Sequence, residues 1–294
     1  MDRRVGFKAA WLGALLVVPQ ILLVFVFFYW PAGGALYWAF TLEQPWGGGN
    51  TFVGLDNFKA VLGDVAYWES IVMSLVFAFG ATALSMGLGL LFALFCDRQL
   101  RGHKWYQTAL VWPYAVAAPA AGVAFRFLFA PEAGVFAALN KIYPGLWDPY
   151  QLGWQAMVMV ILAYSWKYVA YSFLFFLAGL QAIPRSMIEA SAMDGAGPLR
   201  RMWDLQIPLL APTFFFLVVI NLTDSFVDSF GIIDMTTHGG PSRATNLMVY
   251  KIYFDGFRGL DYSGAATQSV LLMALVMLLT AVQFRWMERR VHYK

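Results

Sequence analysis

The sequence predicts an all-α integral membrane protein with six transmembrane helices. Of its 294 residues, 60% are hydrophobic and only 13% are charged, which is far more apolar than a soluble globular domain. The apolar residues gather into long runs, each close to the ~20 residues that cross a bilayer as a helix. Because the chain shows no internal repeat and no low-complexity tract, we expect one transmembrane domain over residues 1–294.

The runs place the spans at about 11–30, 70–95, 108–129, 154–180, 209–233 and 266–286. The first run, Trp11–Trp30, is too long for the apolar core of a typical signal peptide. We therefore expect a retained helix and not a cleaved leader. Pro31–Glu69 reads as a polar interval.

Small residues and prolines mark the second and third spans. Ala81, Ser85 and Gly89 recur every four positions, a spacing that lets helix backbones approach closely in a membrane. Pro113 and Pro119 lie inside the third span. Internal prolines are tolerated where neighbouring groups satisfy the freed carbonyls, so bends are expected there.

The distribution of basic residues predicts the orientation. An even number of spans puts both ends of the chain on one side, and most of the 20 Lys and Arg residues lie on that side: Arg3, Arg4, Lys8, Arg98, Arg101, Lys104, Arg185, Arg200, Arg201, Arg285, Arg289, Arg290 and Lys294. The opposite side has Lys59, Lys141, Arg243, Lys251 and Arg258. The positive-inside rule then predicts that both termini and the 181–212 loop are cytoplasmic.

Several classes of enzyme are excluded by their missing motifs. The sequence has no G-x-x-x-x-G-K-[ST] phosphate loop, no H-E-x-x-H and no G-x-S-x-G. One cysteine, Cys96, and three scattered histidines give no metal-ligating cluster. The formal charge of +3 does not indicate a nucleic-acid partner. We therefore expect no catalytic residues, no metal site and no ATPase site in this chain.

Charged residues within the spans are the next signal, because they are costly in a bilayer. Lys167 lies near the middle of the fourth span, and Asp224 and Asp228 lie four apart on the fifth, hence on one helix face. Lys167 could pair with Asp228 and lock two helices together, or it could meet a transported anion. Arg126 lies near the outer end of the third span and could extend to the interface.

A long polar interval, Gln181–Pro212, lies between two of the most apolar runs. Pro184 suits a first helical turn, and a short helix-compatible run follows it. The break from Asp194 to Pro198 turns the chain, after which a second amphipathic run, Leu199–Ile207, ends at Pro208. The segment is either a solvated linker or a docking element for another protein.

The spacing within this interval resembles the cytoplasmic coupling loop of ABC importer permeases. That loop has E-A-A, three residues, Gly, nine residues and I-x-L-P, and the chain has Glu189-Ala190-Ser191, Gly195 and Leu205–Pro208 at these distances. Phe52–Phe58 and Gly239-Gly240-Pro241 resemble outer-loop sequences of the carbohydrate-uptake type. Almost end to end, the chain is similar to the A-type permeases of bacterial sn-glycerol-3-phosphate importers.

This resemblance implies a type I importer bundle in the bacterial inner membrane, with a cytoplasmic coupling helix in the 181–208 loop. It implies a second related permease, an extracytoplasmic binding protein, contacts with membrane lipid, and two ATPase subunits that hold ATP and Mg, with no cofactor in this chain. The implied contacts to the ATPase are Glu189, Ala190, Ser191, Asp194, Gly195 and Pro208.

The resemblance also implies a substrate, sn-glycerol 3-phosphate together with glycerophosphodiesters. A dianion crossing the membrane needs cationic or hydrogen-bonding groups, and the candidates for its path are Lys167, Tyr164, Asp224, Asp228 and Arg126. Two alternatives stay open. One is a permease for a neutral sugar or polyol, and the other is a secondary transporter that uses Asp224 and Asp228 as proton or cation sites. A structural scaffold would leave the coupling loop unexplained.

Overall fold

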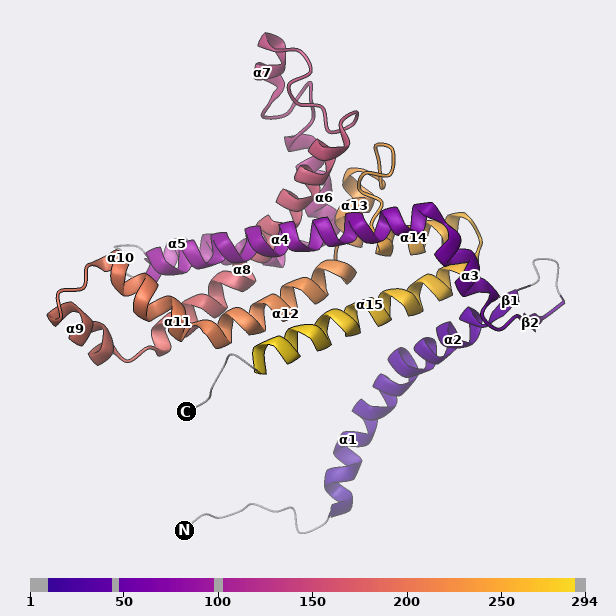
Figure 1. The fold of residues 1–294 in the computed structure, drawn as a ribbon, viewed down its shortest axis with the longest axis horizontal. Coiled ribbons are helices and arrows are strands. Elements are labelled where there is room, and N and C mark those ends of the chain that lie inside the picture. The colour runs from indigo at the N-terminus through magenta and orange to yellow at the C-terminus, as the bar shows by residue number, and fades with distance from the viewer. Residues whose placement is uncertain (1–9, 44–47, 98–102, 289–294) are drawn as a thin grey trace. The chain divides into compact units, whose positions relative to one another are not determined.

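The computed structural model describes residues 10–43, 48–97 and 103–288. Several residues of the predicted orientation signal lie outside this part, namely Arg3, Arg4, Lys8, Arg98, Arg101, Arg289, Arg290 and Lys294. The chain forms two compact units, Met1–Asp64 with Ile252–Leu271, and Val65–Lys251 with Leu272–Lys294. Figure 1 shows the helices that make up both. Four helices are each long and apolar enough to cross a membrane, and counting two bent helix pairs as one span each gives six.

The first unit begins with a helical stretch that is longer than predicted. α1 (Ala10–Val24) continues through a π-helical turn, η1 (Phe25–Tyr29), into α2 (Trp30–Ala39), so the apolar span covers Leu15–Ala39 and does not end at Trp30. Pro31 does not end the helix, because it lies at the start of α2 directly after the π turn. A proline at that position removes a hydrogen bond from a ladder that is already irregular.

A small hairpin follows the first span. Strands β1 (Thr41–Glu43) and β2 (Asn50–Phe52) pair antiparallel, with Thr41 opposite Phe52. The Asn57 amide, in α3 (Asp56–Gly63), donates to the carbonyls of Ala39 and Thr41 at 3.1 and 2.9 Å. The conformation of the predicted outer-loop sequence Phe52–Phe58 is thereby tied to the end of α2. The unit also contains η4 (Phe254–Arg258) and the first part of α15 (Tyr262–Glu288).

The second unit is built on α4 (Val65–Asp97) and α8 (Gly153–Ala182), which pack along each other (Figure 1). The predicted small-residue positions lie in their interface. A Cβ added to Gly89 would lie 2.7 Å from Cβ of Ser172, and the Ser165 hydroxyl donates to the carbonyl of Ala81 at 3.3 Å. The prediction of close backbone approach through this stripe is confirmed.

The third predicted span, 108–129, is broken and not a single helix. α5 (His103–Val111) leads into the 3-10 turn η2 (Trp112–Ala115), and α6 (Ala118–Leu128) then leaves at 104° to the preceding helix. Pro113 lies in the 3-10 turn and Pro119 opens α6. Bends at these prolines were predicted, but a turn of this size was not. The loop after α6 carries the short helix α7 (Ala137–Ile142).

The helices observed in the 181–212 interval and in the fifth span do not have the predicted boundaries. α9 (Arg185–Met193) is followed by α10 (Pro198–Arg201), the π turn η3 (Met202–Gln206) and α11 (Ile207–Leu209). The helical run therefore passes through Pro208, which again lies just after a π turn, and bends by 65° before α12 (Ala211–Val227). The predicted span 209–233 is also interrupted at Asp228–Ser229, where α12 gives way to α13 (Phe230–Thr236).

α13 packs against α6 in the second unit. A Cβ added to Gly122 would lie 2.9 Å from Cβ of Met235, and one added to Gly231 would lie 3.1 Å from the Pro119 ring. The pairing is close because glycines face the partner helix from both sides. After α13 the chain turns through residues 237–247 into α14 (Met248–Tyr253), within an interval predicted to be a loop.

Candidate functional site

The predicted coupling segment is a helix ended by a specific turn. Pro184 stands at the N-cap of α9 in an extended conformation, and the helix ends where Gly195 adopts φ +80°. The Gly195 N–H donates to the Ala192 carbonyl at 3.0 Å and the Ala196 N–H to the Ser191 carbonyl at 3.1 Å. These two bonds form a Schellman motif, which requires a left-handed residue at the position of Gly195.

The six predicted coupling residues lie at the surface of this segment. Glu189, Ala190, Asp194, Gly195 and Pro208 are exposed. Ser191 is half-buried, and its hydroxyl donates to the Ile188 carbonyl at 2.8 Å. The five exposed residues are therefore accessible to an external contact.

Large apolar side chains also point away from the protein here. Met193 is 88% exposed, Leu199 69% and Trp203 64%. Ile188 faces the other way, against a core cluster that includes Leu180, Ile183 and Leu210. A segment anchored on one face, with exposed apolar residues beside charges on the other, is typical of a protein-binding surface.

Within the membrane-spanning part, the polar residues of α8 face the broken turn η2. The Lys167 ammonium lies 5.1 Å from the centre of the Tyr168 ring and 5.6 Å from that of Tyr114, close enough for cation–π attraction. Tyr164 stacks on Tyr168 with ring centres 4.2 Å apart, and Tyr114 stacks on Tyr171. Non-helical backbone at membrane depth occurs where it is buried or lines a cavity, which makes Tyr114 a candidate that the sequence did not single out.

The two acids of α12 are placed differently from each other. The Tyr168 hydroxyl donates to the Asp228 carboxylate at 2.6 Å, whereas Asp224 is half-buried one turn earlier. Among the described residues, no carboxylate lies within ion-pair distance of Lys167. The structure therefore does not contain the Lys167–Asp228 pair that the sequence left open, and Tyr168 takes the place of the lysine as the partner of Asp228.

A buried polar network around Asn221 joins α12 to α4 and α8. The Asn221 side chain of α12 accepts from Ser85 of α4 at 3.2 Å and donates to Ser172 of α8 at 3.3 Å. Its amide also donates to the Leu217 carbonyl at 2.9 Å. Sequence reasoning missed Asn221, although an amide in the apolar run of α12 is itself a signal, since buried amides need partners.

Arg126 belongs to a separate group of residues. Its guanidinium lies at the end of α6, 3.4 Å from the His238 ring and 6.0 Å from the centre of the Tyr150 ring. None of the interactions described for it reaches Lys167 or the two acids of α12. The five residues predicted for the substrate path are thus divided between two places.

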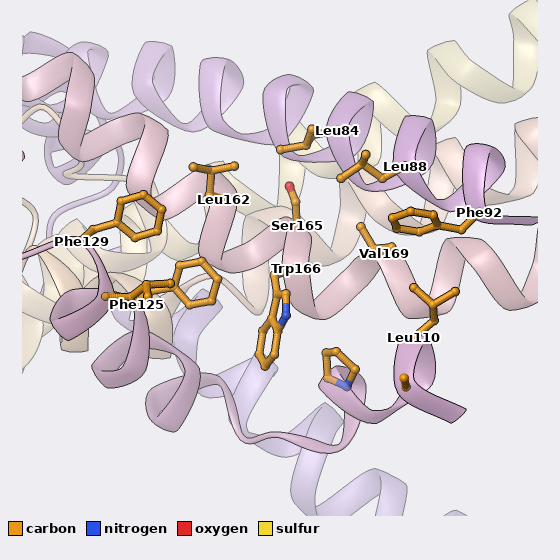
Figure 2. A pocket seen from close by; sticks show the side chains of 13 residues that line it. Leu84, Leu88, Phe92, Leu110, Phe125, Phe129, Leu162, Ser165, Trp166 and Val169 are labelled. Carbon is orange, nitrogen blue, oxygen red and sulfur yellow. The ribbon is translucent and has the colours of Figure 1, made fainter. Parts of the chain in front are cut away.

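A cavity of about 430 Å³ lies on another face of α8, between α4 and the bent pair α5 and α6. Figure 2 shows Phe125, Phe129 and Trp166 on its wall. Its 13 lining residues carry no charge, and the Ser165 hydroxyl is directed at the carbonyl of Ala81. The cavity has nothing to hold a phosphate, so we do not assign the substrate to it.

The described residues contain no group of three or more side chains that could hold a metal ion. Comparison with protein families gives a match over residues 10–293 to the binding-protein-dependent transport system inner membrane component. The chain belongs to this family. It is an ABC importer permease, a transport subunit without an ATPase site of its own, as the motif search predicted.

Curated relatives of the permease share its whole length. It is 50% identical over 291 residues, 99% of each chain, to the sn-glycerol-3-phosphate transport system permease protein UgpA of Rhizobium meliloti (strain 1021). The protein of the same name from Yersinia enterocolitica is 46% identical, again over 99% of each chain.

The fold is that of known importers. The permease superposes with a TM-score of 0.83 on a chain from the crystal structure of a bacterial ABC transporter involved in the import of the acidic polysaccharide alginate, at 19% identity and with 96% of each chain covered. The predicted importer fold is confirmed at this level.

Proposed function

We propose that this permease is a subunit of an ATP-driven importer of sn-glycerol 3-phosphate and of glycerophosphodiesters. The observation that carries the proposal is the 50% identity, over nearly the full length, to permeases named for sn-glycerol 3-phosphate. Neutral-sugar permeases of the same family share the fold, so the fold alone does not select the substrate. Because the sequence identity to these permeases extends over spans and loops alike, it favours sn-glycerol 3-phosphate as the substrate.

The assembly we propose has a second, related permease, an extracytoplasmic binding protein and two ATPase subunits that bind ATP and Mg. The exposed face of α9 and α10 supports contact with an ATPase, because apolar and charged side chains stand there unpartnered by the core. One solved structure of similar fold, with a TM-score of 0.79, is of an alginate transporter in complex with a periplasmic protein. In this proposal α9 and both termini face the cytoplasm.

Lys167 is the residue we place in contact with the phosphate, with Tyr164, Asp224, Asp228 and Arg126 as further members of the path. Among the described residues Lys167 forms no ion pair, and an unpaired ammonium in a span costs a few kcal/mol even on lenient scales. A transported anion relieves this cost and gains charge-assisted hydrogen bonds.

The test is uptake of labelled sn-glycerol 3-phosphate by proteoliposomes that hold the whole complex. We expect uptake to need ATP and the binding protein, to stop with vanadate and to continue with an uncoupler. Uptake stopped by the uncoupler but not by vanadate would identify a secondary transporter instead. The proposed substrate is wrong if a neutral sugar or polyol is taken up while sn-glycerol 3-phosphate is neither taken up nor competes.

A further inference from the structure

A second cluster of titratable side chains lies at the end of α6, apart from Lys167. Nη1 of Arg126 is 3.4 Å from Nε2 of His238, and Nδ1 of His238 is 3.8 Å from the Asp234 carboxylate. The Tyr150 ring lies 6.0 Å from the Arg126 guanidinium carbon. The side chains of Arg126, His238 and Tyr150 are exposed, and that of Asp234 is only 20% exposed.

The backbone holds this cluster in place from three directions. α6 and α13 are packed together through Gly122 and Gly231, which fixes the ends of the two helices relative to each other. The His238 N–H donates to the Ile233 carbonyl at 2.9 Å while His238 itself is at φ +50°. The Tyr150 hydroxyl donates to the Arg126 carbonyl at 3.3 Å. The imidazole and the guanidinium are therefore presented side by side by ordered backbone.

The cluster has more donors than acceptors. A guanidinium has five N–H donors, and among the described residues the only interactions of the Arg126 side chain are with His238 and the Tyr150 ring. No described carboxylate pairs with it. Arg243, by comparison, lies in the loop that also carries His238, and its guanidinium is 3.4 Å from the Glu69 carboxylate.

From this geometry we infer that Arg126 and His238 together form a binding site for a phosphate-bearing anion. The guanidinium offers a planar pair of donors to phosphate oxygens, and the imidazole lies beside it at 3.4 Å. The source of the phosphate is the sn-glycerol 3-phosphate of the proposed function, on which this step rests, or the headgroup of a phospholipid.

The experiment is calorimetric titration of the purified complex in maltoside detergent, which contains no phosphate, with sn-glycerol 3-phosphate and separately with inorganic phosphate. We expect Arg126→Gln to weaken binding about tenfold or more, as for loss of a charged hydrogen bond. Arg243→Gln is the matched control and should leave binding unchanged. His238→Gln should also weaken binding, because it removes the imidazole that lies beside the guanidinium.

A second arm identifies the source. The complex is placed in nanodiscs of phosphatidylglycerol or of phosphate-free galactolipid. If Arg126→Gln and His238→Gln reduce retention of phosphatidylglycerol by the complex and leave the titrations unchanged, the phosphate is that of the lipid. If neither variant changes either readout, the inference is wrong. Failure of the proposed function is separate, since wild-type proteoliposomes would then take up no sn-glycerol 3-phosphate while inorganic phosphate binding at Arg126 persisted.

Discussion

At the residue scale, two neighbours on α8 have different polar environments. Tyr168 has a strong acceptor in Asp228 at 2.6 Å, whereas Lys167 has tyrosine rings beside it and no described carboxylate partner. The lysine is therefore available to a ligand. The tyrosine is committed to holding α8 against the end of α12.

Replacing Lys167 should test its role in transport. We expect Lys167→Gln to lower the rate of sn-glycerol 3-phosphate uptake about 10- to 100-fold, which corresponds to a charged hydrogen bond of about 1.5–3 kcal/mol. Assembly and basal ATPase activity should be retained, because no ion pair is lost. Lys59→Gln, which removes an exposed lysine paired with Asp56, serves as the control. Normal uptake by Lys167→Gln would remove this residue from the substrate path.

The two stacked tyrosines provide a matched pair of variants for stability. Tyr168→Phe removes the donor to Asp228 and should reduce the free energy of unfolding by about 1.5–3 kcal/mol. Tyr164→Phe should cost little, because the buried Tyr164 hydroxyl has no hydrogen-bond partner among the described residues. Thermal unfolding of the purified complex measures both. Equal losses in the two variants would contradict the assigned role of Asp228.

The sequence could identify single charges at this scale but not their partners. Lys167, Asp224 and Asp228 were evident because charge is rare in apolar runs. The partner of Asp228 depended on how far α12 extends and on the rotation of α8, which no spacing within one helix determines. Asn221 was overlooked for a related reason. Its importance comes from Ser85 and Ser172 on two other helices.

At the element scale, the turn after α9 depends on one glycine. Gly195 is at φ +80° with no atom within 4 Å of an added Cβ, so the backbone conformation and not space excludes other residues. Gly195→Ala should cost about 1–2 kcal/mol and misplace α10, lowering substrate-stimulated ATPase activity and uptake together. Gly195→Asn should retain more activity, because asparagine tolerates this conformation.

Gly197 supplies the matched control for this prediction. It also has no atom within 4 Å of an added Cβ, and its φ is −67°. Gly197→Ala should therefore cost less than Gly195→Ala in both assays, because it loses only the preference for glycine over alanine at the N-cap of α10. If Gly195→Ala and Gly197→Ala behave alike, the Schellman turn is not required for coupling.

The α4–α8 interface makes a similar prediction about packing. Gly89→Ala places a methyl group 2.7 Å from Ser172 Cβ and 2.9 Å from the Phe173 amide nitrogen. Overpacking of this kind costs about 1–3 kcal/mol, so the thermal unfolding temperature of the complex should fall. Gly87→Ala, with nothing within 4 Å, is the control. An unchanged unfolding temperature for Gly89→Ala would mean that the two helices can move apart freely.

Element boundaries were the least predictable feature from sequence. Both Pro31 and Pro208 were taken to end a helical run, and in both places the helix continues after a π turn. A π turn adds one residue to a single turn of an α-helix. No simple sequence pattern marks where this happens. The break at Pro113 and Pro119 could be predicted, but its 104° angle depends on packing against α8 and α13.

At the scale of the whole molecule, orientation remains a prediction that labelling can test. In a Cys96→Ser background, Ser186→Cys on α9 should not react with an impermeant maleimide added to intact spheroplasts. Thr51→Cys in the exposed hairpin strand β2 should react readily. Both should react after the membrane is permeabilised. Rapid external labelling at position 186 would show that the orientation is opposite to the predicted one. It would then also contradict the proposed contact of α9 with a cytoplasmic ATPase.

The membrane class could be predicted from composition, and the importer fold from the resemblance carried by the spacing of Glu189, Gly195 and Pro208. The coupling role of that segment stays a prediction. The contact between Arg126 and His238 at the end of α6 could not be predicted from the sequence. Arg126 and His238 are separated by 112 positions in the chain, and only the contact between α6 and α13 brings them together.

The exposed apolar residues of the coupling segment have a consequence for how the cell makes this protein. Met193, Leu199 and Trp203 are exposed in this chain, and in the proposed assembly an ATPase subunit covers them. Exposed apolar patches of this kind promote aggregation and proteolysis. We therefore expect a copy synthesised in excess of its ATPase to be short-lived, and degradation of such copies would keep the ratio of subunits constant without matched rates of translation.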